Sequence, residues 1–70
     1  MEMTPMRRSR ALEEAGYDAV TRTLRVRFRH GGGYDYLDVP PEVFDGLISS
    51  AHPWTEWREA ILAYEYRRLD

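Results

Sequence analysis

The sequence predicts one small α+β domain: a three-stranded antiparallel β-meander followed by two helices packed on one face of the sheet. Two observations carry this prediction. Apolar and polar residues alternate along residues 23–29, as in a strand with one buried face. Apolar residues then recur at helical spacing after Pro40 and again after Pro53. A chain of 70 residues allows a single domain with a small core, so the predicted order is β-β-β-α-α.

The three strands are expected at residues 12–18, 23–29 and 34–39, with a glycine turn at 31–33. The apolar side chains of the second strand would face the core: Leu24, Val26 and Phe28. The arginines between them would face outward: Arg25, Arg27 and Arg29. Residues 1–10 show no such pattern, so we expect a flexible N-terminal arm there and the domain over 11–70.

The face on which Tyr34 and Tyr36 lie depends on the hairpin register, because a shift of one residue moves every side chain to the other face. If the three glycines alone form the loop, Arg29 lies opposite Asp35 and Phe28 opposite Tyr36, so both tyrosines face the core. A loop of two or four residues would set the tyrosines beside the arginines instead. We favour the three-glycine loop because it pairs opposite charges across the strands.

Two helices should follow the strands. Pro40 and Pro41 fit the first turn of a helix, where missing N–H groups cost little. Its apolar stripe would be Val43, Phe44, Leu47 and Ile48. The second helix is expected over 53–68, with one broad apolar face: Trp54, Trp57, Ala60, Ile61 and Tyr64. Two such helices offer more apolar surface than a small sheet can cover, so we expect part of it to contact a partner or a second copy.

Several short motifs recur together in this order. They are Gly16-Tyr17-Asp18, Leu24-x-Val26-x-Phe28, Gly31, Tyr34-x-Tyr36 and Val39-Pro40. Over residues 12–51 this pattern resembles the KTSC domain family, a short domain named after the C-terminus of some lysyl-tRNA synthetases. The segment "AHPWTEW" after residue 50 departs from the family, whose members have a glycine there. The resemblance implies a small α+β module for which RNA binding is the suggested role, and it supplies no catalytic residues.

Charge alone does not favour nucleic acid, because the formal net charge is −2 and nucleic-acid binders are usually basic. The arginines are nevertheless clustered, in the arm and along the second strand. We therefore predict a non-catalytic module that binds RNA or DNA phosphate through the sheet face and the arm. The candidate residues are Arg7, Arg8, Arg10, Arg25, Arg27 and Arg29, with Tyr34 and Tyr36 stacking on bases if exposed.

The alternative is a protein-interaction module, such as a small bacterial or phage-encoded adaptor or inhibitor, or a homodimer. It would use an acidic edge and exposed aromatic side chains: Asp35, Asp38, Glu42, Asp45, Trp54 and Tyr66. The acidic net charge favours this alternative, whereas the arginine row favours nucleic acid.

We expect no enzyme, metal or cofactor. The chain has no cysteine, and His30 and His52 lack the spacing of metal ligands. Ser49 and Ser50 have no assigned base. The glycine run lacks a phosphate-loop pattern and leads into a strand. No apolar run could span a membrane and no signal-peptide pattern is present, so we expect a cytoplasmic protein.

Overall fold

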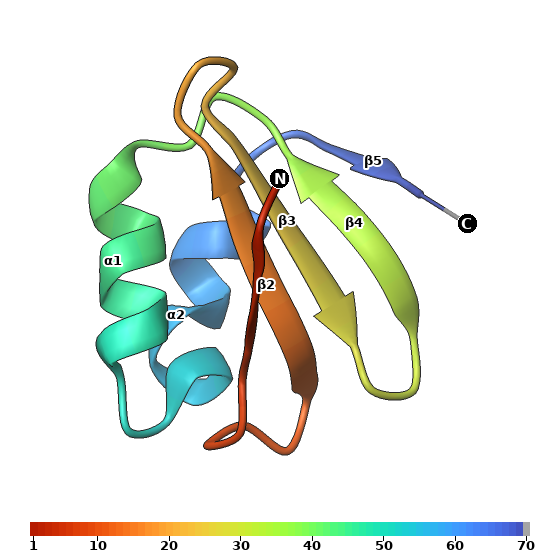
Figure 1. Ribbon diagram of the computed structural model, residues 1–70, viewed down its shortest axis with the longest axis vertical. Helices are drawn as coiled ribbons and strands as arrows, with labels where there is room; N and C mark the ends of the chain where they lie inside the picture. Colours follow the sequence, from red (N-terminus) through yellow and green to blue (C-terminus); the bar gives the residue numbers. More distant parts are fainter. Residues whose placement is uncertain (70) are drawn as a thin grey trace.

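The computed structural model describes residues 1–69 and shows a five-stranded antiparallel sheet with two helices on one face (Figure 1). In sheet order the strands are β1 (Met3–Pro5), β2 (Leu12–Asp18), β3 (Thr23–Phe28), β4 (Gly32–Tyr36) and β5 (Tyr66–Arg68). Between β4 and β5 the chain forms α1 (Pro41–Ser49) and α2 (Pro53–Leu62). The predicted α+β class is confirmed. The prediction of three strands was wrong, because it missed the two edge strands, each of which is only three residues long. No helix among the described residues is long and apolar enough to cross a membrane.

The segment predicted to be a flexible arm instead supplies one edge of the sheet. β1 pairs antiparallel with β2, and Met6 is buried in the core with 4% of its surface exposed. The Ser9 hydroxyl accepts hydrogen bonds from the backbone N–H groups of Ala11 and Leu12 at 3.2 and 2.9 Å. Burial of Met6 and this local bonding order the segment, and neither has a periodic signature in the sequence.

The β3–β4 hairpin turns through residues 29–31 and not through the three glycines. Phe28 pairs with Gly32, whose φ of 80° is a conformation that glycine adopts without a Cβ clash. Gly32 and Gly33 therefore belong to β4. The loop still has three residues, so the side chains of β4 face the sides that the favoured register predicted.

The faces are thus as predicted, whereas the residue pairs differ. Tyr34 lies opposite Val26 and therefore on the helix side of the sheet, together with Tyr36. Asp35 lies opposite Arg25 and not opposite Arg29. The loop lies two residues earlier than predicted, so each residue of β4 pairs with a residue four positions earlier in β3.

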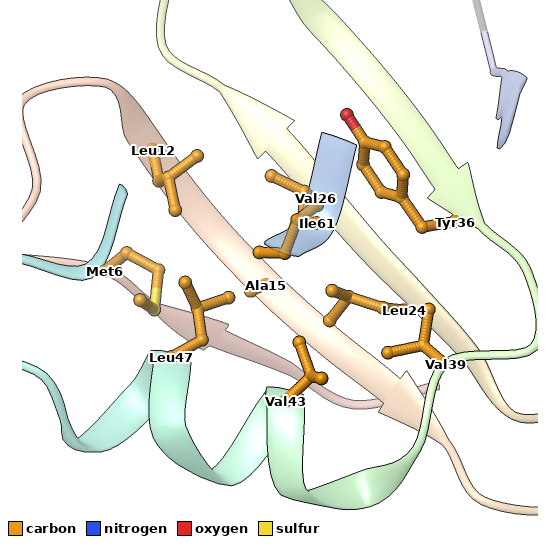
Figure 2. Close-up of a cluster of buried hydrophobic side chains, with 10 residues drawn as sticks. All are labelled: Met6, Leu12, Ala15, Leu24, Val26, Tyr36, Val39, Val43, Leu47 and Ile61. Carbon is orange, nitrogen blue, oxygen red and sulfur yellow. The ribbon is translucent and has the colours of Figure 1, made fainter. Parts of the chain in front are cut away.

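One hydrophobic core lies between the sheet and the helices (Figure 2). Its buried side chains are Met6, Leu12, Ala15, Leu24, Val26, Tyr36, Val39, Val43, Leu47 and Ile61. The two helices approach closely where Gly46 of α1 faces Trp57 of α2, since a Cβ at position 46 would overlap the indole ring. The glycine is therefore needed for this helix contact.

α2 ends at Leu62, so the prediction of a helix over 53–68 was wrong beyond that residue. The chain turns and adds β5 to the free edge of β4, where the Leu69 N–H donates to the Gly33 carbonyl at 2.9 Å. An unpaired strand edge offers backbone partners to any nearby extended segment. This tertiary pairing outweighs the helical spacing of the aromatic residues, and it leaves part of the sheet beyond α2 uncovered (Figure 1).

Candidate functional site

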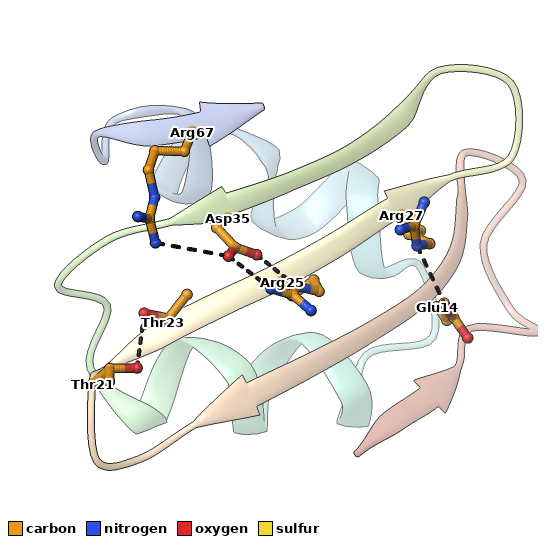
Figure 3. A network of polar contacts seen from close by, with 7 residues as sticks. All are labelled: Glu14, Thr21, Thr23, Arg25, Arg27, Asp35 and Arg67. Carbon is orange, nitrogen blue, oxygen red and sulfur yellow. Dashed lines mark hydrogen bonds and ion pairs between the residues drawn. The ribbon is translucent and has the colours of Figure 1, made fainter. Parts of the chain in front are cut away.

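The arginines of β3 lie on the sheet face opposite the helices, and there they are paired with carboxylates (Figure 3). Arg25 donates two hydrogen bonds to Asp35, from Nε to Oδ1 at 2.8 Å and from Nη2 to Oδ2 at 3.0 Å. The Asp35 side chain is only 5% exposed and also lies 4.0 Å from Nη2 of Arg67. The hydrogen bond to Asp35 raises the pKa of Arg25 above its ordinary value. Asp35 therefore holds two strands together and belongs to no accessible acidic edge.

The rest of this open face is also balanced in charge. Arg27 Nε lies 3.9 Å from Glu14 Oε2 on the neighbouring strand. Phosphate binding depends on cations that can neutralise the nucleic-acid backbone. Arg25 and Arg27 therefore already face carboxylates, and the exposed Arg67 shares Asp35 with Arg25.

Arg29, the third arginine of the predicted row, has a different task. Its Nε donates to the Ser9 carbonyl at 3.1 Å and its Nη2 to the Met6 carbonyl at 3.0 Å. The guanidinium thus anchors the N-terminal segment to the end of β3. The predicted row of three equivalent outward arginines is wrong in this respect, because Arg29 lies beyond the strand, where the hairpin loop begins.

On the helix side of the sheet, a cavity of about 550 Å³ opens beyond the end of α2. Its walls include Phe28, His30, Tyr34, Tyr36, Leu62 and Tyr66, and we call it the aromatic cavity. They come from the β3–β4 hairpin, the last residue of α2 and β5. Its volume lies within the range of about 300–1,000 Å³ that is typical of small-molecule sites.

The rings around this cavity hold one another in place. Phe28 lies edge-on to Trp54 at 5.0 Å between ring centroids and edge-on to Tyr34 at 5.7 Å. Tyr34 in turn lies edge-on to Tyr66 at 5.7 Å. Aromatic pairs prefer this T-shaped geometry. The wall is therefore formed before any ligand arrives, with Tyr66 as its exposed member at 61%.

The Tyr-x-Tyr pair of the sequence belongs to this wall. Tyr36 is almost fully buried, and its burial raises its pKa above the ordinary tyrosine value. Tyr34 is half-buried, and the Arg68 guanidinium lies 5.8 Å above its ring centroid. The alternative register, which would have set these tyrosines beside the β3 arginines, does not occur, because the hairpin places Arg25 and Tyr34 on opposite faces of the sheet.

A second hollow of about 380 Å³ adjoins the aromatic cavity, and Ala11 lines both. Arg8, Arg10 and His52 line it together with Trp54, and we call it the basic hollow. The Arg8 and Arg10 side chains are exposed and form no hydrogen bond or ion pair with any residue in the range 1–69. Of the predicted phosphate-binding arginines, these two are therefore free beside the aromatic rings. Arg7 lines a third hollow, near Ile48, to which Arg8 also contributes.

The residues of the alternative prediction do not form one surface. The Asp38 side chain is 91% exposed and lies 3.5 Å from Arg22, while Glu42 and Asp45 are exposed on α1. Asp35 is buried on the open face. Trp54 is half-buried and lines the basic hollow, and Tyr66 lines the aromatic cavity.

Some residues of the site were missed by sequence reasoning. Phe28 was assigned to the core alone, although the register of β3 and β4 places its ring and that of Tyr34 on the same face of the sheet. Leu62 could not be found, because the helix was expected to continue past it. His30 and His52, considered as metal ligands, line separate hollows, and within residues 1–69 no group of three or more His, Asp or Glu is arranged to hold a metal ion.

The protein is a small antiparallel-sheet domain with two helices on one face of the sheet and an aromatic cavity beyond the end of α2. The family model of the KTSC domain matches residues 8–67, so the chain belongs to the KTSC domain family. The match extends beyond residue 51, where the sequence pattern alone had weakened.

Two known proteins illustrate the relationship. A protein of Tsukamurella paurometabola is 50% identical over 42 residues, which cover 60% of this chain and 63% of that relative. The match thus spans less than two thirds of the relative's length. The crystal structure of a KTSC domain protein from Yersinia pestis matches with a TM-score of 0.87 at 24% identity, covering 99% of this chain and 97% of the other. That likeness supports the fold described above.

Proposed function

We propose that this protein is a non-catalytic module that binds single-stranded nucleic acid, RNA in the first place, at the aromatic cavity. One observation carries the proposal: a preformed wall of aromatic rings borders a hollow that holds the unpaired arginines Arg8 and Arg10. Proteins that bind single strands combine these two features, because bases stack on aromatic rings and phosphates contact cations. Such a role is in keeping with the cytoplasmic location that the sequence predicts.

The shape of the site supports single strands over duplexes. The bases of a duplex are stacked inside the helix and cannot enter a cavity beside a strand hairpin, whereas an unpaired base can be turned out. The pocket is lined mainly by rings and by the Leu62 side chain, so it offers stacking more than base-specific hydrogen bonds. We therefore expect weak sequence preference.

The net charge of −2 is compatible with this proposal if binding depends on a few local contacts. Two or three phosphate contacts on a single strand would give a salt slope of roughly −1.4 to −2.1 in log K against log salt concentration. That slope is shallow compared with the slope of a strongly basic protein, and the measured slope can be compared with it directly.

Fluorescence anisotropy with a labelled single-stranded RNA at two salt concentrations tests the proposal. Tyr66→Ala should weaken binding by about 1–3 kcal/mol, the usual loss for one stacked base. Leu69→Ala is the matched control, because the Leu69 side chain lies on the opposite face of the sheet, where a Cβ at position 33 would meet it and Arg27. Absence of RNA binding by the wild type at low salt, or equal losses in both variants, would contradict the proposal.

The protein-interaction alternative keeps one supporting observation. Leu62 and Tyr66 at the cavity rim are more than half exposed, and such a rim could also hold an apolar side chain of a partner. If the wild type binds no RNA but forms a stable dimer in light scattering, the cavity is better explained as a protein contact.

A further inference from the structure

The aromatic cavity and the basic hollow share a wall, and their chemistry differs sharply. We infer, on the basis of the proposed function, that together they hold one unpaired nucleotide of a single strand. Its base lies in the aromatic cavity, and its adjoining phosphate lies in the basic hollow against Arg8 and Arg10. The ligand is thus a nucleotide unit, defined by both its base and its phosphate.

The two compartments lie close enough for one nucleotide to reach both. Ala11 lines both hollows, so the wall between them includes a side chain that is only a methyl group. Phe28 of the aromatic cavity contacts Trp54 of the basic hollow at 5.0 Å between centroids. A base and its phosphate are joined through a single sugar, so the two compartments on either side of these shared and touching residues match the two ends of one nucleotide.

The charges in the basic hollow suit an anion. Its lining contains arginine, histidine and hydroxyl side chains, and no Asp or Glu of the described chain is among them. The nearby carboxylate of Glu56 is bonded to the Ser50 hydroxyl. Arg8 and Arg10 therefore have no carboxylate competitor in the hollow, in contrast to Arg25 and Arg27 on the open face.

The position of the two arginines is fixed by the fold. Arg8 and Arg10 flank Ser9, which is buried and caps the following turn through its hydroxyl. Arg29 holds this segment through the carbonyls of Met6 and Ser9. The backbone that carries the cations is therefore held in place before binding, which lowers the entropic cost of ligand capture. Arg29 acts here as a positioning residue.

Two matched double variants test the phosphate contact. Arg8→Gln/Arg10→Gln and Arg22→Gln/Arg58→Gln remove the same charge, but Arg22 and Arg58 are exposed outside both hollows. Binding of a single-stranded RNA trinucleotide would be measured by anisotropy from low to moderate salt. The first double variant should reduce the salt slope by roughly 0.7 for each phosphate that is no longer neutralised, and the control should keep the wild-type slope.

The base contact is tested with an abasic trinucleotide of the same length and charge. It should bind the wild type at least fivefold more weakly than the normal trinucleotide, because it cannot stack. Equal salt slopes in the two double variants, or equal affinity for the abasic strand, would overturn the one-nucleotide inference while RNA binding itself stands. If the wild type binds no RNA at all, the proposed function fails together with the inference.

Discussion

The arginines of β3 and those of the N-terminal segment carry the same group in opposite surroundings. Arg25 and Arg27 form the most regular pattern in the sequence, yet carboxylates on both neighbouring strands pair with them. Arg8 and Arg10 lie in an irregular segment and have no such partner in the described chain. The comparison shows that a row of cations on a strand predicts free charge only when the neighbouring strands carry no anions.

The two faces of the sheet differ in the same way. On the open face, pairs of opposite charges hold the strands together (Figure 3). The helix side instead has an aromatic cavity beyond the end of α2. The expected nucleic-acid surface is thereby divided: stabilising charges on one face, stacking rings on the other. Substitutions on each face can separate these two roles.

The largest expected effect is on the stability of the open face. Asp35→Ala removes a nearly buried carboxylate that accepts two hydrogen bonds from Arg25, and should lower the free energy of unfolding by about 1.5–3 kcal/mol. Asp38→Ala, at an exposed pair 3.5 Å apart, should cost about 0–1 kcal/mol. Urea unfolding measures both. Equal losses would mean that burial of Asp35 has no energetic consequence.

Arg29→Gln should have the next largest effect, because it removes two hydrogen bonds to the N-terminal segment. We expect a loss of about 1.5 kcal/mol and faster hydrogen exchange at the Met6 amide, which donates to the Glu13 carbonyl at 3.0 Å. RNA binding should weaken as well. Arg58→Gln on α2 is the control, and unchanged exchange at Met6 in Arg29→Gln would refute the anchoring role.

A smaller effect is expected for Arg25→Gln, in which one of the two hydrogen bonds to Asp35 can still form. The loss of stability should be about 1 kcal/mol, and the salt slope of RNA binding should stay at the wild-type value. Thermal unfolding and the anisotropy titration give the two readings. If Arg25→Gln reduced the salt slope as much as Arg8→Gln/Arg10→Gln does, the phosphates would contact the open face and not the basic hollow.

The smallest effect concerns alkaline pH and the helix side alone. Burial raises the pKa of Tyr36 and of Tyr17, so the folded state keeps both protons at a pH where the unfolded chain ionises. Their contribution is fully present below about pH 10 and is lost as the pH rises through the folded pKa values. Tyr36→Phe should therefore flatten the fall in stability above about pH 10, as measured by urea unfolding at several pH values. An unchanged profile would show that the cavity wall does not shield the phenol.

The sequence was sufficient wherever a strong local pattern agrees with the tertiary structure. β2, β3, α1 and the faces of the hairpin follow from alternation, prolines and loop length, and the KTSC pattern agrees with them. β1 and β5 could not be predicted, because each has only three residues and is defined by backbone pairing, β1 with β2 and β5 with β4. The cavity depends on β5 and on the early end of α2, so it could not be predicted from the sequence, although Tyr34 and Tyr36 were named as candidate binding residues. The anchoring role of Arg29 depends on carbonyl groups, which have no side-chain signature.

The most direct test is an amide chemical-shift titration of the whole protein with a short single-stranded RNA. We expect the shifts to cluster at Ala11, His30, Tyr34 and Tyr66, around the two hollows, while Glu14, Arg25 and Arg67 on the open face stay unchanged. Shifts confined to the open face would contradict the proposed site, because they would show that the paired arginines, and not the aromatic cavity with Arg8 and Arg10, meet the nucleic acid.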